Sequence, residues 1–321
     1  MPTSEDPPVF HAGERLAQTR AGVRERMAAL GPKVIRDFMP EQHRAFFAQL
    51  PFLVVGSLDD AGQPWARVLA NPPGFISSPD AHHLLIQARP RATDPIHDTL
   101  RVDTPVALLG IELPTRRRNR MNGMIEQSTD KGLLIAVHQS FGNCPKYIQA
   151  RPVHYVDLER IGTVHAATTL SDRTRPLVLR ADTFFIATAH PSSLHETTRA
   201  HGVDVSHRGG KPGFVRVEDD RTLTIPDFTG NHFFNTLGNL MLHPRAGLLF
   251  IDFENGDLLY VAADATVIFE GPELKAFAGA ERLLQLQIRQ VRHVVRSLPL
   301  RWGRDVQMSP FLANTGGWTP A

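Results

Sequence analysis

The sequence is poor in cysteine and has no strong imbalance of charge. Cys144 is the one cysteine among 321 residues, which excludes a disulfide framework within the chain and a cysteine-based zinc or iron–sulfur cluster. The 35 lysines and arginines against 33 aspartates and glutamates leave a formal charge of +2, which disfavours a nucleic-acid-binding protein. We therefore predict no nucleic-acid partner.

Long hydrophobic runs are also missing. No stretch approaches the roughly 18 apolar residues of a membrane span. The first twenty residues contain acidic residues and prolines, whereas a signal peptide has a basic start and an apolar run. We therefore expect a cytoplasmic protein without a membrane partner.

Several common binding motifs are absent. The chain has neither a GxGxxG nor a GxxxxGK[ST] segment, which removes the usual dinucleotide and nucleoside triphosphate sites. His195 and His201 flank a glutamate, but at a spacing of six residues they would not share a helical face as zinc-binding histidines do. We predict no metal site, and the sequence assigns no residue a catalytic role.

The length argues for two domains of roughly 150 residues each. With 42% hydrophobic and 21% charged residues, the chain can form well-packed cores. Apolar residues at helical spacing predict a helix from Glu14 to Leu30 that ends at Gly31 and Pro32. A second short helix is predicted from Pro40 to Leu50.

From Phe52 onward the sequence is typical of short strands separated by turns, as in FLVVGSL, DDAGQP and WARVLA. This strand pattern occurs twice. In each copy a strand ending in Arg-Val, at Arg67 or Arg216, precedes a short apolar strand, a short helix ending at Pro105 or Pro244, and a further apolar strand. The offsets are 149 residues at the arginines (216 minus 67) and 139 at the prolines (244 minus 105).

Any two β-rich stretches look somewhat alike, but the agreement of element order with both markers favours duplication. The predicted fold is mainly β with peripheral helices, built from two tandem six-stranded antiparallel units. The predicted organisation is a helical segment over 1–50, a first unit over 51–155 and a second over 156–321.

One segment, AERLLQLQIRQVRHVVRS, fits both helical and strand spacing. Its position in the repeat favours a strand, because GLLIAVHQ occupies the same place in the first copy. A short helix is predicted before it, from Pro272 to Ala278.

A basic, glycine-rich segment covers residues 206–216. Its glycines and proline allow the backbone to approach a ligand closely, and Ser206, Arg208 and Arg216 would suit a phosphate monoester. A hairpin turn kept wet by basic residues is an equal alternative.

Two further stretches could bind anions. Thr229, Asn231, Thr236 and Asn239 surround a predicted helix start, where free backbone N–H groups favour negative charge. The basic run over residues 116–120 could also contact phosphates, or it could form a solvated turn that leads into a strand.

The segment SFGNCPKYIQ contributes Asn143, Cys144, Lys146 and Tyr147. A cysteine beside lysine tends toward the thiolate form. A catalytic thiol also needs a positioned base, and the sequence assigns none. We therefore expect Cys144 to form the wall of a ligand pocket rather than to act as a nucleophile.

At these residues the chain resembles the pyridoxamine 5'-phosphate oxidase-related FMN-binding split-barrel proteins, and more narrowly the subgroup with two barrels in one chain. The matching stretches include GQPWARVLANPPGFI, SFGNCPKYIQAR, SHRGGKPGFVRV and NTLGNLMLHPRAGLLFIDFENG, and with FHAGERLAQ and LPLRW they cover most of the sequence. The resemblance implies two tandem split barrels with FMN held at their boundary.

Carried onto this sequence, the resemblance implies that the second barrel binds the FMN phosphate and that the first approaches the ring. The implied residues are Ser206, Arg208, Arg216, Asn231, Thr236 and Asn239, with Asn143, Cys144, Lys146 and Tyr147 from the first copy. True pyridoxamine phosphate oxidases carry a basic strand motif where Glu218 and Asp219 follow Val217 here. This departure argues against oxidation of vitamin B6.

The expected function is an FMN-dependent oxidoreductase acting on a small-molecule substrate, with NAD(P)H or a separate reductase as electron donor. The alternative is a non-catalytic protein that binds or stores flavin or haem, because no acid–base pair can be placed. Relatives associate as pairs, which predicts a homodimer, although the duplicated halves could also pair within one chain.

Overall fold

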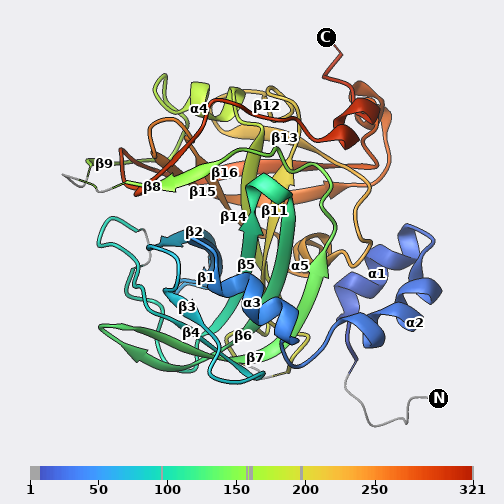
Figure 1. The fold of residues 1–321 in the computed structure, drawn as a ribbon. Helices are drawn as coiled ribbons and strands as arrows, with labels where there is room; N and C mark the ends of the chain where they lie inside the picture. Colours follow the sequence, from blue (N-terminus) through green and yellow to red (C-terminus); the bar gives the residue numbers. More distant parts are fainter. Residues whose placement is uncertain (1–7, 95–96, 157, 159–161, 196–197, 320–321) are drawn as a thin grey trace.

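Two large antiparallel β-sheets dominate the computed structural model, which describes residues 8–94, 97–156, 158, 162–195 and 198–319 (Figure 1). The predicted class, mainly β with two tandem antiparallel split barrels, is confirmed. No helix within the described ranges is long and apolar enough to cross a membrane.

The first sheet has seven strands in the order β2-β1-β5-β6-β7-β4-β3, one more than predicted because of the short β3. The DDAG hairpin forms as expected between β1 and β2, where Gly62 has a φ of 73°. The strands are β1 (Phe52–Leu58), β2 (Pro64–Ala70), β3 (Ile76–Ser77), β4 (His83–Ile86), β5 (Pro105–Glu112), β6 (Arg117–Thr129) and β7 (Gly132–Asn143).

The second sheet has the order β11-β10-β14-β15-β16-β13-β12, with β9 paired to β16 at its side. A separate pair joins β8 (Val153–Tyr155) to β17 (Leu300–Trp302). The strands of the second sheet are β9 (Val164–Ala167), β10 (Thr183–Ala189), β11 (Val203–Gly209), β12 (Arg216–Val217), β13 (Thr222–Asp227), β14 (Arg245–Ile251), β15 (Leu258–Ile268) and β16 (Arg282–Val294).

The strand orders show the duplication directly, since β10 to β16 take the places of β1 to β7. Val55 of β1 pairs with Arg67, and Ile186, at the equivalent place in β10, pairs with Ser206. Arg67 and Ser206 are therefore equivalent. The expected match of Arg67 with Arg216 is wrong, because Arg216 lies on β12, the counterpart of the short β3.

The same register relates the next strands. Leu109 of β5 pairs with Arg120, and Leu249 of β14 pairs with Tyr260, so Arg120 and Tyr260 are equivalent. Pro105 and Pro244 are not equivalent, because the register makes Arg245, one position after Pro244, the counterpart of Pro105. A helix before Pro105 is not observed, since residues 97–104 form turns.

The segment with ambiguous spacing is the strand β16, as its place in the repeat predicted. Leu284, Leu286 and Ile288 are buried between exposed neighbours, which is the period-two pattern of a strand. The helix predicted before it is the short 3-10 helix η2 (Pro272–Ala276).

A hydrophobic core joins the two sheets and contains side chains from β1, β2 and β5 together with β10, β11 and β14. The strands approach closely where β14 passes β2: a Cβ atom at Gly247 would lie 2.1 Å from the backbone oxygen of Pro64. Each sheet also has a core of its own. The two halves are thus packed against each other through a continuous apolar interface.

Three helices precede the first sheet: α1 (Ala12–Arg20), α2 (Arg24–Val34) and α3 (Glu41–Ala48). The single helix predicted over 14–30 is wrong, because the chain turns at Gly22, with a φ of 67°, and α2 continues through Pro32. The short helix predicted over 40–50 is observed as α3.

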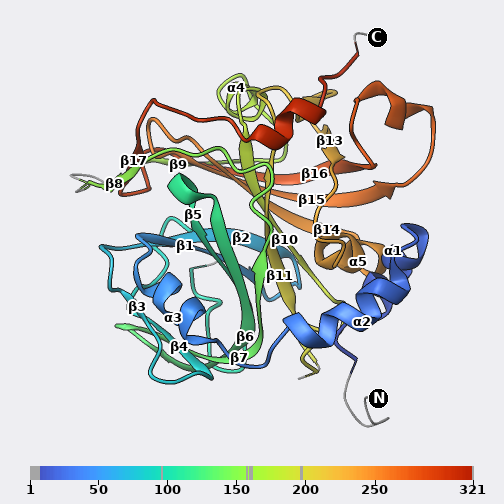
Figure 2. The same ribbon diagram turned by 45° about the vertical axis from the view of Figure 1, so that its right-hand side comes forward.

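Helix α1 lies beside α5 (Asn235–Leu242) of the second half (Figure 2). Glycines make the close approach: a Cβ atom at Gly13 would lie 2.1 Å from the backbone oxygen of Gly238. His11 and Glu14 form a capping box that fixes the start of α1. The remaining helices are α4 (Arg175–Leu179), η1 (Leu113–Thr115) and η3 (Pro310–Asn314).

Candidate functional site

A pocket of about 80 Å³ lies where the two halves of the chain meet. Its walls come from β6 and the residues after β7 in the first half, and from β11, the end of β13 and the start of α5 in the second. We call it the arginine pocket, because its lining includes Arg118, Arg120, Arg208 and Arg282.

The positive charge of this pocket is only partly balanced. Asp227 accepts hydrogen bonds from Arg208 Nη1 at 2.6 Å and from Arg282 Nε at 2.8 Å. Arg118 donates instead to the backbone oxygen of Cys144 at 2.7 Å, and no carboxylate of the described chain forms an ion pair with it. Because arginine stays protonated in proteins, the wall keeps excess positive charge.

A serine and a helix start stand beside the arginines. Ser206 Oγ accepts hydrogen bonds from Arg120 Nη2 and, at 3.0 Å, from Thr236 Oγ1. Thr236 lies in the first turn of α5, where no side chain of the described residues caps the free backbone N–H groups. The positive end of the helix dipole therefore adds to the attraction for an anion.

The backbone around the pocket is strained. Tyr147, His232 and Phe234 have φ values of 62°, 64° and 64°, although none of them is glycine. His232 and Phe234 line the pocket, and the Tyr147 ring lies 5.0 Å from that of Phe228, which also lines it. Such conformations cost about 1–3 kcal/mol each and gather at functional sites.

A buried polar network behind the pocket holds Arg120. Asp204 Oδ1 accepts hydrogen bonds from Arg120 Nη1 at 2.8 Å and from Asn122 Nδ2 at 2.9 Å. Its other oxygen accepts one from Asn239 Nδ2 at 3.1 Å. Side chains of both halves thus fix one guanidinium group, which lowers the entropy cost of binding a ligand there.

The N-terminal helix α1 joins this network through Glu14. Asn235 donates to a carboxyl oxygen of Glu14, and its own side-chain oxygen accepts from Arg120 Nη1 at 3.0 Å. Burial, and then the charge of Asp204, raise the pKa of the Glu14 carboxyl well above its usual value. Helix α1 therefore supports the position of Arg120 through one intervening side chain.

A wider cleft of about 810 Å³ adjoins the arginine pocket, and the two share His232 and Arg282. Its walls include Arg20 at the end of α1, whose guanidinium lies 4.9 Å above the ring of Phe269. A cationic pocket of the size of a phosphate thus opens beside a space that can take a larger planar group.

The sequence-predicted residues are brought together to a large extent. Lys146 and Tyr147 lie next to Cys144, with Lys146 Nζ 5.4 Å above the ring of Phe311. Asn239 lies behind the pocket in the polar network. Six of the ten predicted residues line the arginine pocket: Asn143, Cys144, Ser206, Arg208, Asn231 and Thr236.

Arg216 lies outside this group. Its Nη2 pairs with Glu218 Oε1 at 2.5 Å, and its guanidinium lies 4.2 Å above the ring of Trp318. Arg216 therefore has partners of its own at the surface of β12. The assignment of all ten residues to a cofactor stays a prediction.

Three arginines and Asn235 were missed as candidates. Arg118 and Arg120 belong to the basic run that sequence alone left open as a phosphate contact. Strand alternation could have separated them from Arg117 and Asn119, because residues two apart face the same side. Arg282 gives no local signal, since its place depends on the pairing of β16 with β13.

Cys144 lines the arginine pocket. Its Sγ lies 3.6 Å from Arg118 Nη2, and its backbone oxygen accepts from Arg118 Nε. The hydrogen-bond partner of the thiol is thus an arginine rather than a histidine that could remove its proton.

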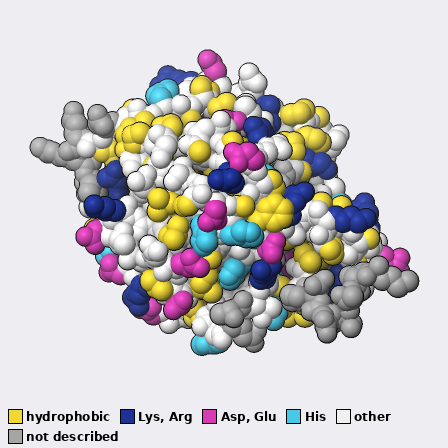
Figure 3. Space-filling view, turned by 60° about the horizontal axis from the view of Figure 1, so that its bottom comes forward, with side chains coloured by type: hydrophobic (Ala, Val, Ile, Leu, Met, Phe, Trp, Pro, Cys, Tyr) yellow, Lys and Arg dark blue, Asp and Glu magenta, His cyan; other side chains and the backbone are white. Residues whose placement is uncertain are grey.

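Several histidines gather on one face of the molecule beside acidic side chains (Figure 3). His190 and His201 are stacked with ring centroids 3.9 Å apart, and His11 lies 5.0 Å from His190. Within the described residues, no group of three or more histidine, cysteine, aspartate or glutamate side chains is arranged to hold a metal ion. The pair at His195 and His201 flanks residues outside the described ranges.

Three solved structures are each similar to a part of the chain. A putative pyridoxamine 5'-phosphate oxidase from Lactobacillus delbrueckii is 17% identical over 39% of this chain and 94% of its own, with a TM-score of 0.30. An FMN-binding protein from Syntrophomonas wolfei is 13% identical over 38% of this chain and 87% of its own, with a TM-score of 0.27. HupZ from Group A Streptococcus is 14% identical over 37% of this chain and 90% of its own, with a TM-score of 0.29.

No curated protein matches the chain. A family model does: residues 39–165, which include the whole first sheet, match the model described as pyridoxamine 5'-phosphate oxidase. Over these residues, the chain is similar to the pyridoxamine 5'-phosphate oxidase family.

Proposed function

We propose that the chain is a flavoprotein that binds FMN at the boundary of its two barrels. The arginine pocket would hold the phosphate through Arg118, Arg120, Arg208, Ser206 and Thr236. The adjoining cleft provides room for the larger ring system. The convergence of four arginines, a hydroxyl pair and the start of α5 on one small pocket carries this proposal.

The chemistry of these groups fits a phosphate monoester. Hydrogen bonds that involve a charged group contribute about 1.5–3 kcal/mol each, so two or three of the arginines suffice for tight retention. Arg208 Nε and Asn143 Nδ2 are buried and have no hydrogen-bond partner within the described residues. Such donors are expected where a ligand supplies the acceptor.

We further propose an oxidoreductase that acts on a small-molecule substrate, with NAD(P)H or a separate reductase as electron donor. FMN, when bound, supplies the transfer of electrons or hydride. The residues of the chain hold the phosphate, position the ring and limit access of water. Both sides of the pocket come from one chain, so the proposed site does not require a second copy, although a cytoplasmic homodimer remains part of the proposal.

A non-catalytic flavin- or haem-binding protein is the second candidate, and the pocket itself provides the observation that favours it. Two of its titratable side chains are engaged by arginines: Asp227 by Arg208 and Arg282, and His232 Nδ1 by Arg26 at 3.0 Å. A third, His207, is buried, and burial followed by the charges of Arg118 and Arg208 lowers its pKa well below the usual value. Burial and the charge of Arg26 also lower the pKa of His232. These contacts restrain both groups from moving a proton.

The test begins with the visible absorbance of the purified chain and titrations with FMN and riboflavin. We expect one FMN per chain and binding of riboflavin weaker by at least about 100-fold, because riboflavin lacks the phosphate. Absence of binding by FMN, or equal binding of the two, would reject the proposed site. Bound FMN that NADH, NADPH and a flavin reductase all fail to reduce would favour the non-catalytic candidate.

A further inference from the structure

An exposed surface beside the arginine pocket combines apolar side chains with positive charge. It forms where residues 306–319 pack against the segment that follows β7. Met308 is 42% exposed and Phe311 36%, and Lys146 Nζ lies 5.4 Å above the Phe311 ring. We call it the C-terminal face, defined by Arg116, Lys146, Lys211, Met308 and Phe311. Exposed apolar patches with a polar rim mark interaction sites.

Hydrogen bonds hold the C-terminal face in place. Arg116 Nη2 donates to the backbone oxygen of Gln307 at 3.0 Å. Lys211 Nζ donates to the backbone oxygen of Thr315 at 2.6 Å. Because the segments are already fixed, a partner that binds here has little chain to order.

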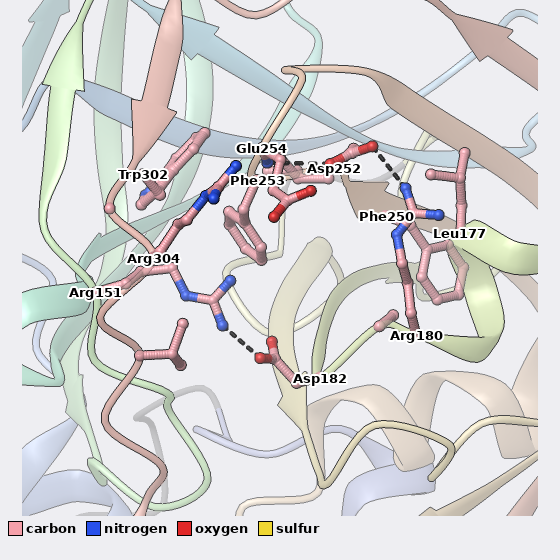
Figure 4. Close-up of a pocket in the computed structure, with 14 residues that line it drawn as sticks. Arg151, Leu177, Arg180, Asp182, Phe250, Asp252, Phe253, Glu254, Trp302 and Arg304 are labelled. Carbon is pink, nitrogen blue, oxygen red and sulfur yellow. Dashed lines mark hydrogen bonds and ion pairs between the residues drawn. The ribbon is translucent and has the colours of Figure 1, made fainter.

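Three segments that build this part of the surface carry no acidic residue. They are residues 140–151, 207–217 and 306–319. Together they contain five lysines and arginines, whereas the rest of the chain has 30 (35 minus 5) against 33 acidic residues. Three of the five pair with acids of other segments, as Arg151 does with Asp182 (Figure 4). Lys146, Lys211 and the neighbouring Arg116 have no carboxylate partner in the described part of the chain, so the face is positive.

The C-terminal face adjoins the arginine pocket through aromatic contacts. Tyr147, which follows Lys146, has its ring 6.2 Å from that of Phe311 and 5.0 Å from that of Phe228. Phe228 lines the arginine pocket. A partner seated on this face would therefore lie beside the proposed flavin.

The charge and shape of the face favour one kind of occupant. A two-fold dimer brings the same patch of both subunits together, so Lys146 and Lys211 would meet like charges. A lipid surface is matched by a helix that buries a whole apolar side, whereas Met308 and Phe311 are each less than half exposed. A methionine and an aromatic ring bordered by cations instead match the core and rim of a protein interface.

We infer that the C-terminal face docks the acidic surface of an electron-donor protein. This inference rests on the proposed function, which includes a separate reductase as electron donor. Acidic side chains of the partner pair with Arg116, Lys146 and Lys211, and its apolar centre covers Met308 and Phe311. Electron-transfer complexes bury small interfaces and are weak, and attraction between opposite charges makes their affinity fall as salt is added.

The probe is a plant-type [2Fe–2S] ferredoxin, an acidic electron carrier, used in its oxidised form so that docking alone is measured. The same ferredoxin with amidated surface carboxylates is the matched control. The chain is saturated with FMN where FMN binds and is used as purified where it does not. By calorimetry we expect binding at roughly 20 mM salt that weakens at least about tenfold at roughly 300 mM salt or on amidation.

Variants locate the docking. Phe311→Glu and Lys211→Glu place a negative charge on the face and should each weaken ferredoxin binding at least about fivefold. Neither side chain lines the arginine pocket or the adjoining cleft, so FMN affinity should not change. Val102→Glu, at a side chain 50% exposed in the first half, and Lys131→Glu, in the exposed turn between β6 and β7, are the matched controls. Met308→Glu replaces Phe311→Glu if that variant fails to fold.

Absence of ferredoxin binding at low salt would overturn the inference, and so would equal binding by the wild type and the folded face variants. Vesicles that contain phosphatidylserine and sedimentation of the chain alone test the other occupants. Vesicle binding without ferredoxin binding, or dimerisation that Phe311→Glu abolishes, would also overturn it. Ferredoxin docking by a chain that does not bind FMN would support the face while rejecting the proposed function, and FMN binding without docking would do the reverse.

Discussion

The two halves of the molecule share one strand order, but equivalent strand positions carry different side chains. In the second half, the equivalent of Arg67 is Ser206, and an arginine from the opposite half, Arg120, reaches it. At the equivalent crevice beside β2, the counterpart of Arg120 is Tyr260 of the second half, and the arginine there is Arg67 of β2 itself. The arginine thus comes from the opposite half at Ser206 and from the same half at Arg67.

This difference fills the crevice that corresponds, in the repeat, to the arginine pocket. The guanidinium of Arg67 is fully buried, lies 3.7 Å from Asp94 and donates to Ser57 Oγ at 3.1 Å. The space left beside Asp94 and Tyr260, which we call the closed crevice, is about 30 Å³, compared with about 80 Å³ in the arginine pocket. Burial, and then the charge of Asp94, raise the pKa of Tyr260 well above its usual value. The charge of Asp94 at the closed crevice is therefore balanced by Arg67, a side chain of the protein itself.

The comparison shows that a duplicated frame does not by itself duplicate a site. The arginine pocket retains Arg118 without a carboxylate partner in the described chain, and it has the helix α5 on one side. The first half forms turns over residues 97–104 where the second forms α5. We therefore expect one cofactor per chain, bound at the arginine pocket between the two halves.

The largest effect should come from breaking the closed crevice. Arg67→Met leaves the carboxylate of Asp94, 5% exposed, without its arginine, and is expected to lower the free energy of unfolding by about 3–5 kcal/mol. Urea unfolding measures this change. FMN affinity should stay within about twofold, since Arg67 does not line the arginine pocket.

A double variant sharpens this test. Adding Asp94→Asn to Arg67→Met removes the buried charge and should restore much of the lost stability. An Arg67→Met protein as stable as the wild type would show that the internal ion pair does not close the crevice.

The next effect concerns the open pocket. Arg208→Ala removes one charged donor and should weaken FMN binding by about 1.5–3 kcal/mol, or roughly 10- to 100-fold. Arg216→Ala is the matched control, because Arg216 pairs with Glu218 and stacks on Trp318 away from the pocket. Calorimetry with FMN measures both. Equal losses in the two variants would contradict the placement of the site.

A third prediction uses pH, because helix α1 supports only the open pocket. Burial, followed by the charges of His190 and His201, lowers the pKa of His11 to about 3. The folded chain therefore binds fewer protons than the unfolded chain between pH 6.5 and 3, and its stability falls as the pH falls through that window. At pH 5 the loss amounts to about 2 kcal/mol.

His11→Asn keeps a side chain that can cap α1 but cannot be protonated in this range. Its stability curve should lack this acid-induced loss, although Glu14, with its raised pKa, contributes a trend of opposite sign in both proteins. Thermal unfolding of both proteins from pH 7 to 5 measures the difference. Parallel curves would show that His11 is not buried in its neutral form.

The smallest effect is expected at Cys144. Cys144→Ser keeps an acceptor for Arg118 Nη2, so FMN affinity should change by less than about twofold. Turnover, once a substrate is found, should also persist. Complete loss of turnover with intact FMN binding would assign the thiol a chemical role.

The sequence predicted the repeated antiparallel units well, because hairpin turns and period-two patterns are local. The sequence does not determine the register between strands. The repeat pattern therefore matches Arg67 with Arg216, whereas its counterpart in the structure is Ser206. The prediction of one long first helix is wrong because a single glycine, Gly22, redirects the chain within an otherwise helical pattern. Arg282 could not be found at all, since it reaches the pocket only through the pairing of β16 with β13.

The contact of Glu14 with Asn235 links the start of the chain to the proposed phosphate site. Thermodynamic reciprocity requires that a ligand which orders Arg120 also tightens the docking of α1, by the same free energy with which docked α1 favours the ligand. Slower hydrogen exchange at the α1 amides on addition of FMN would report this coupling from the opposite end of the sequence.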